Sequence, residues 1–279
     1  MPDLIPSYGK RPKGIVEGGA LRVFLHDGAT EMMTFVRCHG ALSPRMISYH
    51  CGALLNGRML QTALPRALLA EVTNASEIHV GEIPTQPIVK MMKSVHADWL
   101  VNEGKIRLGS VEYYRQHENP EVRDPQEGIC ILTAYDGNET HIYHVRGGLN
   151  DRLLCCYVGD PDPDVINRFG YDAAVEITDV AGFLDAISRS LGSTESSFAR
   201  CLYVRDRVIY GSVNTPLSVQ GAIDGDAAEI LGLARAFLKH ESYKHQSEFR
   251  FLWRGQGHLT DYLDIICPEL TRFCRRVSF

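Results

Sequence analysis

The sequence predicts an α+β protein with mixed or antiparallel sheets and a few packing helices. Short strand-like runs outnumber helical stripes along the chain, and most of these runs are joined by short turns, which is typical of this fold class. The clearest strand spans residues 246–253, where polar and apolar side chains alternate. Because successive side chains of a strand point to opposite faces, its aromatic residues are expected to share one face.

The two faces of this strand differ in chemistry. One face carries three aromatic rings, and the other carries three polar side chains, Gln246, Glu248 and Arg250. On the usual alternation of apolar and polar faces, the polar side is a solvated sheet surface. It can equally be the wall of a cleft. Both interpretations stay open on this stretch alone.

The N-terminal part of the chain predicts short strands and one helix. Residues 14–27 predict a hairpin, because two apolar runs flank Gly18 and Gly19, which tolerate a tight turn. A proline at the first turn favours a short helix at residues 65–72. Further short apolar runs are expected at residues 32–36 and 46–49.

A turn-rich stretch at residues 81–87 predicts a boundary between two parts of the chain. We therefore expect an N-terminal α+β subdomain of unknown role at residues 1–84. The remaining residues, 85–279, are expected to form a catalytic or binding α+β domain.

The C-terminal part predicts alternating strands and helices. A helical stripe begins at Ile88 and stops at Gly104, and Asp179 is the expected N-cap of a second helix. A hairpin is expected at residues 201–213. Further strands are expected at residues 106–111, 129–135, 140–145, 153–158, 173–177 and 262–267. Further helices are expected at residues 179–191 and 226–240.

Composition sets limits on the class of protein. A hydrophobic content of 44%, a charged content of 23% and a net charge of −5 are ordinary for a soluble globular chain and give no signature of nucleic-acid binding. Neither a secretory signal nor a membrane-spanning run is visible, so a cytoplasmic protein is expected. The eight cysteines lie mostly in apolar runs without metal or redox spacing, which favours reduced thiols in the core and predicts no metal site.

Two stretches resemble a widespread, largely uncharacterised bacterial and phage family. The first runs from Gly104 to Ser110 and on through Tyr113 to the pairs Asp124-Pro125 and Glu127-Gly128. The second is the late strand with Lys244, Glu248, Phe249 and Arg250. The similarity covers roughly residues 88–255 and implies no reaction by itself.

A weaker resemblance does imply a reaction. The Gln246-Ser247-Glu248 triplet is similar to the Gln-x-Glu motif on the late strand of ADP-ribosyltransferases, which cleave NAD and transfer ADP-ribose to a protein or nucleic acid. This resemblance implies an ADP-ribosyltransferase-like C-terminal domain with NAD as its substrate. It points to an effector in conflict between phage and bacterium.

The resemblance also implies roles for particular residues. Glu248 stabilises the oxocarbenium-like ribose and holds its 2′-hydroxyl, as carboxylates do in glycoside cleavage, and Gln246 orients the nucleophile. Cofactor contacts are expected from guanidinium groups on the pyrophosphate and an aromatic ring on the nicotinamide. The residues expected for these contacts, with three more from the matched stretches, are Arg107, Arg115, Tyr113, Tyr114, Ser110, Lys244 and Arg250.

Two alternatives belong to other functional classes. The charged residues around 118–127, with Lys244 and Arg250, can form a structural ion-pair network in a non-catalytic binding module, a sensor or antagonist that uses the same cleft for a protein or nucleotide. Alternatively, Glu118, Asp124 and Glu127 can bind Mg²⁺ for phosphodiester hydrolysis, as in a nuclease.

Overall fold

A computed structural model describes the greater part of the chain. The described residues are 15–17, 20–26, 30–39, 72–135, 139–146, 148, 151–160, 162–193, 195–205, 207–210, 226–254 and 261–278. The chain divides into two compact units, each built from three segments. Unit 1 comprises Met1–Ile78, Gly128–Gly148 and Leu202–Glu241, and unit 2 comprises His79–Glu127, Leu149–Cys201 and Ser242–Phe279. These interleaved units differ from two consecutive domains that meet near residue 84.

Unit 1 is built on a mixed sheet that has seven strands among the described residues. In spatial order these are β1 (Ile15–Glu17), β2 (Ala20–His26), β3 (Thr30–His39), β8 (Glu139–Arg146), β7 (Ile129–Tyr135), β13 (Val208–Tyr210) and β4 (Val72–Asn74). The first four junctions are antiparallel, and β13 pairs in parallel with both β7 and β4. Unit 1 also contains η2 (Ala75–Glu77), α7 (Asp226–Phe237) and the parallel pair of β12 (Leu202–Val204) and β14 (Leu238–His240).

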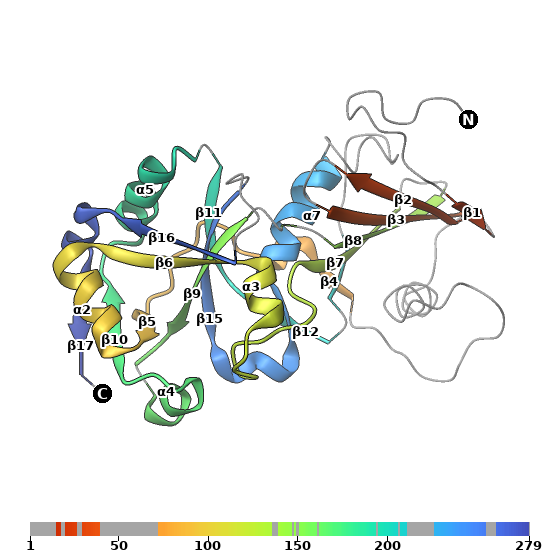
Figure 1. Ribbon diagram of the computed structural model, residues 1–279. Coiled ribbons are helices and arrows are strands. Elements are labelled where there is room, and N and C mark those ends of the chain that lie inside the picture. The colour runs from red at the N-terminus through yellow and green to blue at the C-terminus, as the bar shows by residue number, and fades with distance from the viewer. Residues whose placement is uncertain are drawn as a thin grey trace. The chain divides into compact units, whose positions relative to one another are not determined.

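Unit 2 is built on an antiparallel sheet with eight strands among the described residues (Figure 1). Six follow one path: β11 (Ser196–Arg200), β15 (Glu248–Trp253), β9 (Arg152–Val158), β5 (Ile88–Met92), β10 (Ala173–Ile177) and β17 (Cys274–Val277). The other two, β6 (Lys105–Ser110) and β16 (Tyr262–Ile266), pair with each other and join β9 through β6. In Figure 1 this second pair runs across the direction of β9 and β15.

Helices and short 3-10 turns complete unit 2. They are α2 (Ser94–Glu103), α3 (Val111–Gln116), α4 (Pro163–Phe169), α5 (Val180–Leu191), η3 (Glu241–Gln246) and η4 (Pro268–Arg272). Side chains from α2, α5 and one face of the sheet form the core, including Leu100, Phe183 and the three aromatic rings of β15. Trp253, at the end of β15, is fully buried and donates its indole N–H to Ser188 Oγ.

The α+β class predicted from the sequence is confirmed. The N-terminal hairpin appears as the antiparallel pair of β1 and β2, and the strand expected at 173–177 is β10. Asp179 caps α5, because its carboxylate accepts a hydrogen bond from the backbone N–H of Gly182 at 2.9 Å. The helix expected at 65–72 and the run at 46–49 lie outside the described residues, apart from the last residue of the former.

Two sequence-based expectations were wrong. Residues 88–92 form strand β5 rather than the first turns of a helix, because a short run that is apolar apart from Lys90 fits a buried strand equally well. The strands at 202–204 and 208–210 exist but do not pair as a hairpin, since β12 pairs with β14 and β13 pairs with β7 and β4. Arg207 between them has a positive φ of 52°.

Candidate functional site

A fork in the sheet of unit 2 creates a cavity. Strand β9 pairs with β5 only through Val158 and Tyr157 at one end, and with β6 only through Leu153 and Arg152 at the other. Residues 154–156 lie between these two junctions, where β5 and β6 have separated. The cavity opens there, with β5 on one side, β6 on the other and β9 between them.

The cavity has a volume of about 290 Å³. This is near the lower end of the range for small-molecule sites, which begins at about 300 Å³. Its wall combines aromatic rings, basic side chains and two carboxylates, those of Glu248 and Asp264. Both branches of the fork, α2, α3 and the chain around residues 117–122 contribute to it. Such a mixture suits a flat ring that carries negative charge.

Aromatic side chains form two parts of this wall. Phe169 and Tyr171 are stacked, with centroids 5.8 Å apart and ring planes only 6° from parallel. Tyr113 and Tyr114 on α3 meet edge to face at 5.2 Å. The second pair depends on Gly109, because a Cβ there would lie 2.7 Å from the ring of Tyr114 and 2.8 Å from the ring of Tyr113. The glycine thus makes room for the rings.

Lys90 is a cation of the cavity that the sequence analysis did not identify. Its Nζ donates a hydrogen bond to the carbonyl oxygen of Cys155 at 3.0 Å and lies 6.0 Å from the ring centre of Tyr171. Burial alone lowers the pKa of Lys90, yet nearby Tyr171, Cys156, Cys155 and Tyr113 raise it above its ordinary value, because their deprotonated forms favour the ammonium.

Arg107 lies on the other branch of the fork and is already paired. Its Nε and Nη2 donate to the two carboxylate oxygens of Asp264 at 2.7 and 2.9 Å, and its guanidinium lies 3.7 Å from the ring centre of Tyr262. Hydrogen bonding to Asp264 raises the pKa of Arg107, and the same bond lowers the pKa of Asp264. The carboxylate neutralises much of the charge that Arg107 would offer an anion.

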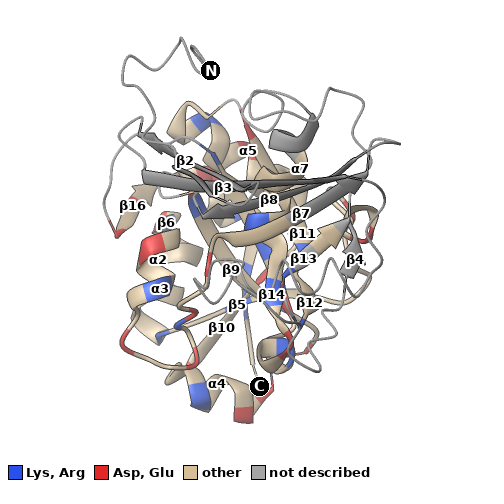
Figure 2. Cartoon of the chain, turned by 90° about the vertical axis from the view of Figure 1, so that its right-hand side faces the viewer, with Lys and Arg blue, Asp and Glu red and all other residues tan. Residues whose placement is uncertain are grey.

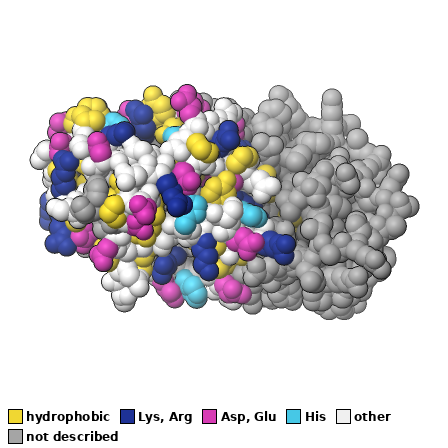
Figure 3. Space-filling view, turned by 90° about the horizontal axis from the view of Figure 1, so that it is seen from below, with side chains coloured by type: hydrophobic (Ala, Val, Ile, Leu, Met, Phe, Trp, Pro, Cys, Tyr) yellow, Lys and Arg dark blue, Asp and Glu magenta, His cyan; other side chains and the backbone are white. Residues whose placement is uncertain are grey.

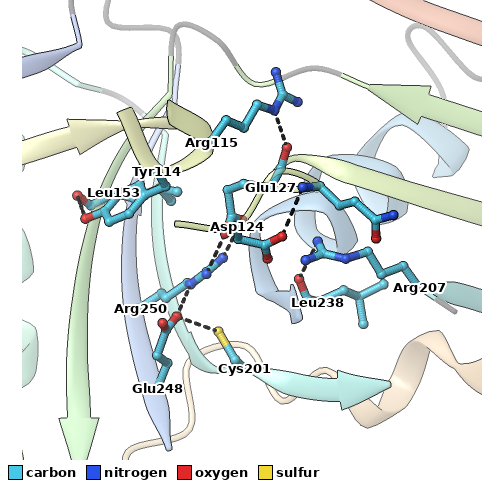
Figure 4. A network of polar contacts seen from close by, with 11 residues as sticks. Tyr114, Arg115, Asp124, Glu127, Leu153, Cys201, Arg207, Leu238, Glu248 and Arg250 are labelled. Atoms are coloured by element: carbon cyan, nitrogen blue, oxygen red, sulfur yellow. Dashed lines mark hydrogen bonds and ion pairs between the residues drawn. The ribbon is translucent and has the colours of Figure 1, made fainter. Parts of the chain in front are cut away.

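Glu248 connects the cavity to a buried ion-pair network (Figure 4). Its Oε2 accepts a hydrogen bond from Arg250 Nε at 2.7 Å and one from Cys201 Sγ at 3.6 Å. Arg250 also donates to both carboxylate oxygens of Glu127, at 2.7 and 2.8 Å. Side-chain exposure is 1% for both Arg250 and Glu127, so water contributes little to this pairing. The guanidinium therefore fixes the position of Glu248.

Gln246 lies near Glu248 but does not share its strand. It ends η3, and the next residue, Ser247, has a φ of +41°, so β15 begins only at Glu248. The expectation that Gln246 and Glu248 occupy one strand face was therefore wrong. The Gln246 amide donates its N–H to the backbone carbonyl of Glu121, although the residue still contributes to the cavity wall.

The polar face of β15 is neither simply a solvated sheet surface nor simply the wall of a cleft, the two alternatives left open by the sequence. Glu248 and Arg250 are both buried, so this face is not a solvated sheet surface. Glu248 forms part of a cavity wall, while Arg250 lies behind it within the ion-pair network. Buried, paired charged side chains rather than solvent thus contact this face of the strand.

The predicted site residues separate into two groups. Five of them line the cavity: Glu248, Gln246, Arg107, Tyr113 and Tyr114. The remaining four, Ser110, Arg115, Lys244 and Arg250, do not belong to its wall. Ser110 is the N-cap of α3, and Lys244 is an exposed residue of η3. Arg115 is buried and donates to the carbonyl oxygen of Glu127 at 2.7 Å and to Glu112 at 3.2 Å.

Tyr114 has its hydroxyl 3.4 Å from the carbonyl oxygen of Leu153, and burial raises its pKa well above the usual range. Tyr113 is half-buried, and its hydroxyl lies 3.1 Å from Nε2 of His117. Burial also raises the pKa of Tyr113, while it lowers the pKa of His117. Both tyrosines are therefore neutral at physiological pH and offer rings and hydroxyl groups rather than charge.

Two of the three acidic residues of the magnesium hypothesis, Asp124 and Glu127, have other roles. Glu127 holds Arg250, and Asp124 accepts a hydrogen bond from the backbone N–H of Gln126 at 3.0 Å. Within the described ranges, no group of three His, Cys, Asp or Glu side chains is placed to hold a metal ion. Six cysteines described with their side chains are thiols, and five of these are buried, consistent with core packing.

Charge on the surface of unit 2 is interspersed rather than segregated. Figure 2 shows acidic and basic residues together on α4, where Asp164 and Arg168 occupy opposite ends. The described part of the face in Figure 3 likewise mixes Lys and Arg with Asp, Glu and His. A nucleic-acid backbone favours a continuous basic surface, so this face offers no such footprint.

Comparison with known proteins yields no relative. No family model, curated protein or solved structure matches the chain. The resemblances noted in the sequence therefore remain predictions. Among the described residues, no helix has the length and apolar character needed to cross a membrane.

Proposed function

We propose that unit 2 binds a nucleotide in the fork cavity. The observation that carries this proposal is the combination of aromatic walls with the charged ammonium of Lys90 inside one cavity of about 290 Å³. Aromatic side chains stack on bases of any sequence, contributing about 1–3 kcal/mol per base. An ammonium group is a common binder of phosphate.

The arrangement of the walls supports a flat ligand. Tyr113 lines the same cavity as both Lys90 and Arg107. The stacked pair of Phe169 and Tyr171 borders the Lys90 side of the cavity. A base between such rings would place an attached phosphate close to a cation.

A direct binding measurement tests this function. We expect at least one of NAD, the nucleoside monophosphates and the nucleoside triphosphates to bind the full chain in isothermal titration calorimetry. As a variant, Gly109→Val places a side chain where the rings of Tyr113 and Tyr114 now lie, and should weaken binding at least about tenfold while the protein remains folded. Absence of binding by every nucleotide to folded wild-type protein would refute the proposal.

A second candidate is cleavage of NAD, favoured by the presence of Glu248 in the wall that also contains Arg107, Tyr113 and Tyr114. In this reaction the bond between ribose C1′ and the nicotinamide nitrogen breaks, and its electron pair leaves with nicotinamide. A nucleophile on a protein or nucleic-acid acceptor then attacks C1′ and loses a proton. The Glu248 carboxylate would stabilise the positive charge on the ribose before that attack.

Released nicotinamide measures this second function. We expect wild-type protein to release nicotinamide from NAD, and Glu248→Gln to reduce the rate at least about 100-fold. The glutamine keeps an oxygen that can accept the bond from Arg250, so the melting temperature shows whether the variant is folded. Glu195→Gln is the matched control, because this exposed acid pairs with Arg254 at the surface, outside the cavity wall. Equal rates in all three proteins would exclude a catalytic Glu248.

A further inference from the structure

We infer that Lys90 is the anion contact of the fork cavity and that the ligand is one aromatic base carrying a single phosphate, the size of a nucleoside monophosphate. This inference rests on the proposed nucleotide-binding function and adds both the residue and the ligand class. The inference is independent of the Gln246-Ser247-Glu248 motif, because Lys90 lies on β5, and β9 lies between β5 and β15 in the sheet.

The position of Lys90 follows from the way the sheet divides. The last pairing between β5 and β9 joins Val89 to Tyr157, so Lys90 is the first residue of β5 beyond the junction. The pairing of β5 with β9 stops before it reaches Cys155 on β9. The Lys90 ammonium donates to the carbonyl oxygen of Cys155. The division of the sheet thus places the Lys90 amine at the point where β5 separates from β9.

The ammonium retains capacity for a ligand. A lysine side chain has three N–H donors, and one of them is directed to Cys155 at 3.0 Å. Among the described residues, no carboxylate forms an ion pair with Lys90. An ammonium donates hydrogen bonds and accepts none, so its chemistry here is to bind an anion.

Two of the other basic residues of the cavity, Arg107 and Lys105, are engaged, while Lys93 lies in the wall as an exposed residue. Arg107 is held at two points by Asp264. Lys105 has its Nζ 4.0 Å from the ring centre of Trp99, in a cation–π contact. A phosphate that approached Arg107 would compete with a carboxylate already in place, whereas one at Lys90 would meet no such competitor among the described side chains. Lys90 is therefore the better anion contact.

Volume favours a mononucleotide over a dinucleotide. A cavity of about 290 Å³ lies at the lower end of the range for small-molecule sites, which begins at about 300 Å³. Such a site suits one base, one sugar and one phosphate better than NAD, which has two of each. Tyr171, whose ring centre lies 6.0 Å from Lys90 Nζ, and Tyr113, which lines the same cavity, place a base beside the bound phosphate.

The test compares nucleoside monophosphates with the matching nucleosides. We would titrate the full chain with AMP, GMP, CMP and UMP, with their four nucleosides, and with NAD. For at least one base, the monophosphate should bind on the order of 10- to 100-fold more tightly than its nucleoside, the contribution of a hydrogen-bonded charge. NAD should bind no more tightly than that monophosphate.

Variants then locate the anion contact. Lys90→Gln removes the charge but keeps an N–H donor for the Cys155 carbonyl, and should abolish the preference for the monophosphate while leaving nucleoside binding within about threefold of wild type. Lys244→Gln is the matched control, because it removes one positive charge from an exposed position outside the cavity wall. Lys90→Arg retains the charge and should keep part of the preference.

Each outcome decides between the claims. Equal affinity of Lys90→Gln and wild type for the monophosphate would overturn the role of Lys90, as would equal affinity of wild type for monophosphate and nucleoside. Binding of NAD without any monophosphate would overturn the size argument and leave nucleotide binding intact. If no nucleotide binds the wild type, the proposed function falls and this inference falls with it. Should Lys90→Gln not fold, the comparison of monophosphate with nucleoside in the wild type still decides.

Discussion

Replacing Glu127 with Gln should lower the free energy of unfolding by about 3–5 kcal/mol, the usual cost of removing one partner from a buried ion pair. Glu127 accepts both terminal nitrogens of Arg250 at 2.7 and 2.8 Å, and neither side chain is more than 1% exposed. Burial by itself lowers the pKa of Arg250, but Cys201, Glu127 and Glu248 raise it well above its ordinary value. The guanidinium therefore stays charged and needs these carboxylates.

Urea denaturation followed by circular dichroism measures this effect. Asp264→Asn is the matched control, because it removes the same chemical group from Arg107 in a pair that is 45% and 40% exposed. Exposed pairs contribute about 0–1 kcal/mol, so the control should unfold close to wild type. Similar stability of Glu127→Gln and Asp264→Asn would contradict the assignment of Arg250 and Glu127 as a buried structural pair.

Gly104→Ala should destabilise the protein by about 2–5 kcal/mol, the sum of left-handed strain and overpacking. Gly104 ends α2 with a φ of 67°, and its N–H bonds back to the carbonyl of Leu100. Its own carbonyl accepts the backbone N–H of Cys267 at 2.9 Å. An added Cβ would collide with the Cys267 carbonyl oxygen and lie 2.7 Å from its carbonyl carbon, so one backbone would have to shift.

Gly170→Ala is the control that separates overpacking from left-handed strain. Gly170 ends α4 in the same left-handed conformation, with a φ of 69°, but a Cβ there meets nothing within 4 Å. Its substitution should cost only the conformational part, about 1–2 kcal/mol. Thermal melts of the two variants measure the difference. If both lose the same stability, close approach of Gly104 to Cys267 is not what requires a glycine at that position.

Local patterns in the sequence predicted much of the fold. Alternation in the stretch that became β15 placed Phe249, Phe251 and Trp253 on one face, and these rings do lie together in the core. Asp179 and Gly104 were correctly assigned as helix ends because capping depends on nearby backbone geometry. Information of this kind is contained within a few residues.

Lys90 shows where local information fails. Read as helix, residues 88–92 gave no reason to expect a cavity at Lys90. As a strand, the same residues pair with β9 and β10. Helix and buried strand cannot be separated by periodicity in so short a run, so the choice depended on strands far along the chain.

The cavity itself is a product of distant pairings. It exists because β9 exchanges β5 for β6 as its neighbour, and β6 in turn pairs with β16. Arg107 and Asp264, which meet across that last pairing, are 157 residues apart in sequence. Five predicted residues did reach the wall, although the sequence predicted no helix at α3, which carries Tyr113 and Tyr114, and placed Gln246 on the late strand rather than in η3. The shape of the space between them had no local signature.

Interleaving of the two units has a consequence for biosynthesis. Strand β9 leaves the ribosome well before β15, its partner along six residue pairs, and β6 emerges before most of the chain that leads to β16. Until those late strands are made, the central strands of unit 2 expose open edges, which invite pairing between chains. Unit 2 therefore completes its sheet only after β15, β16 and β17 are made, and a product that stops before them is expected to aggregate rather than persist as a smaller folded protein.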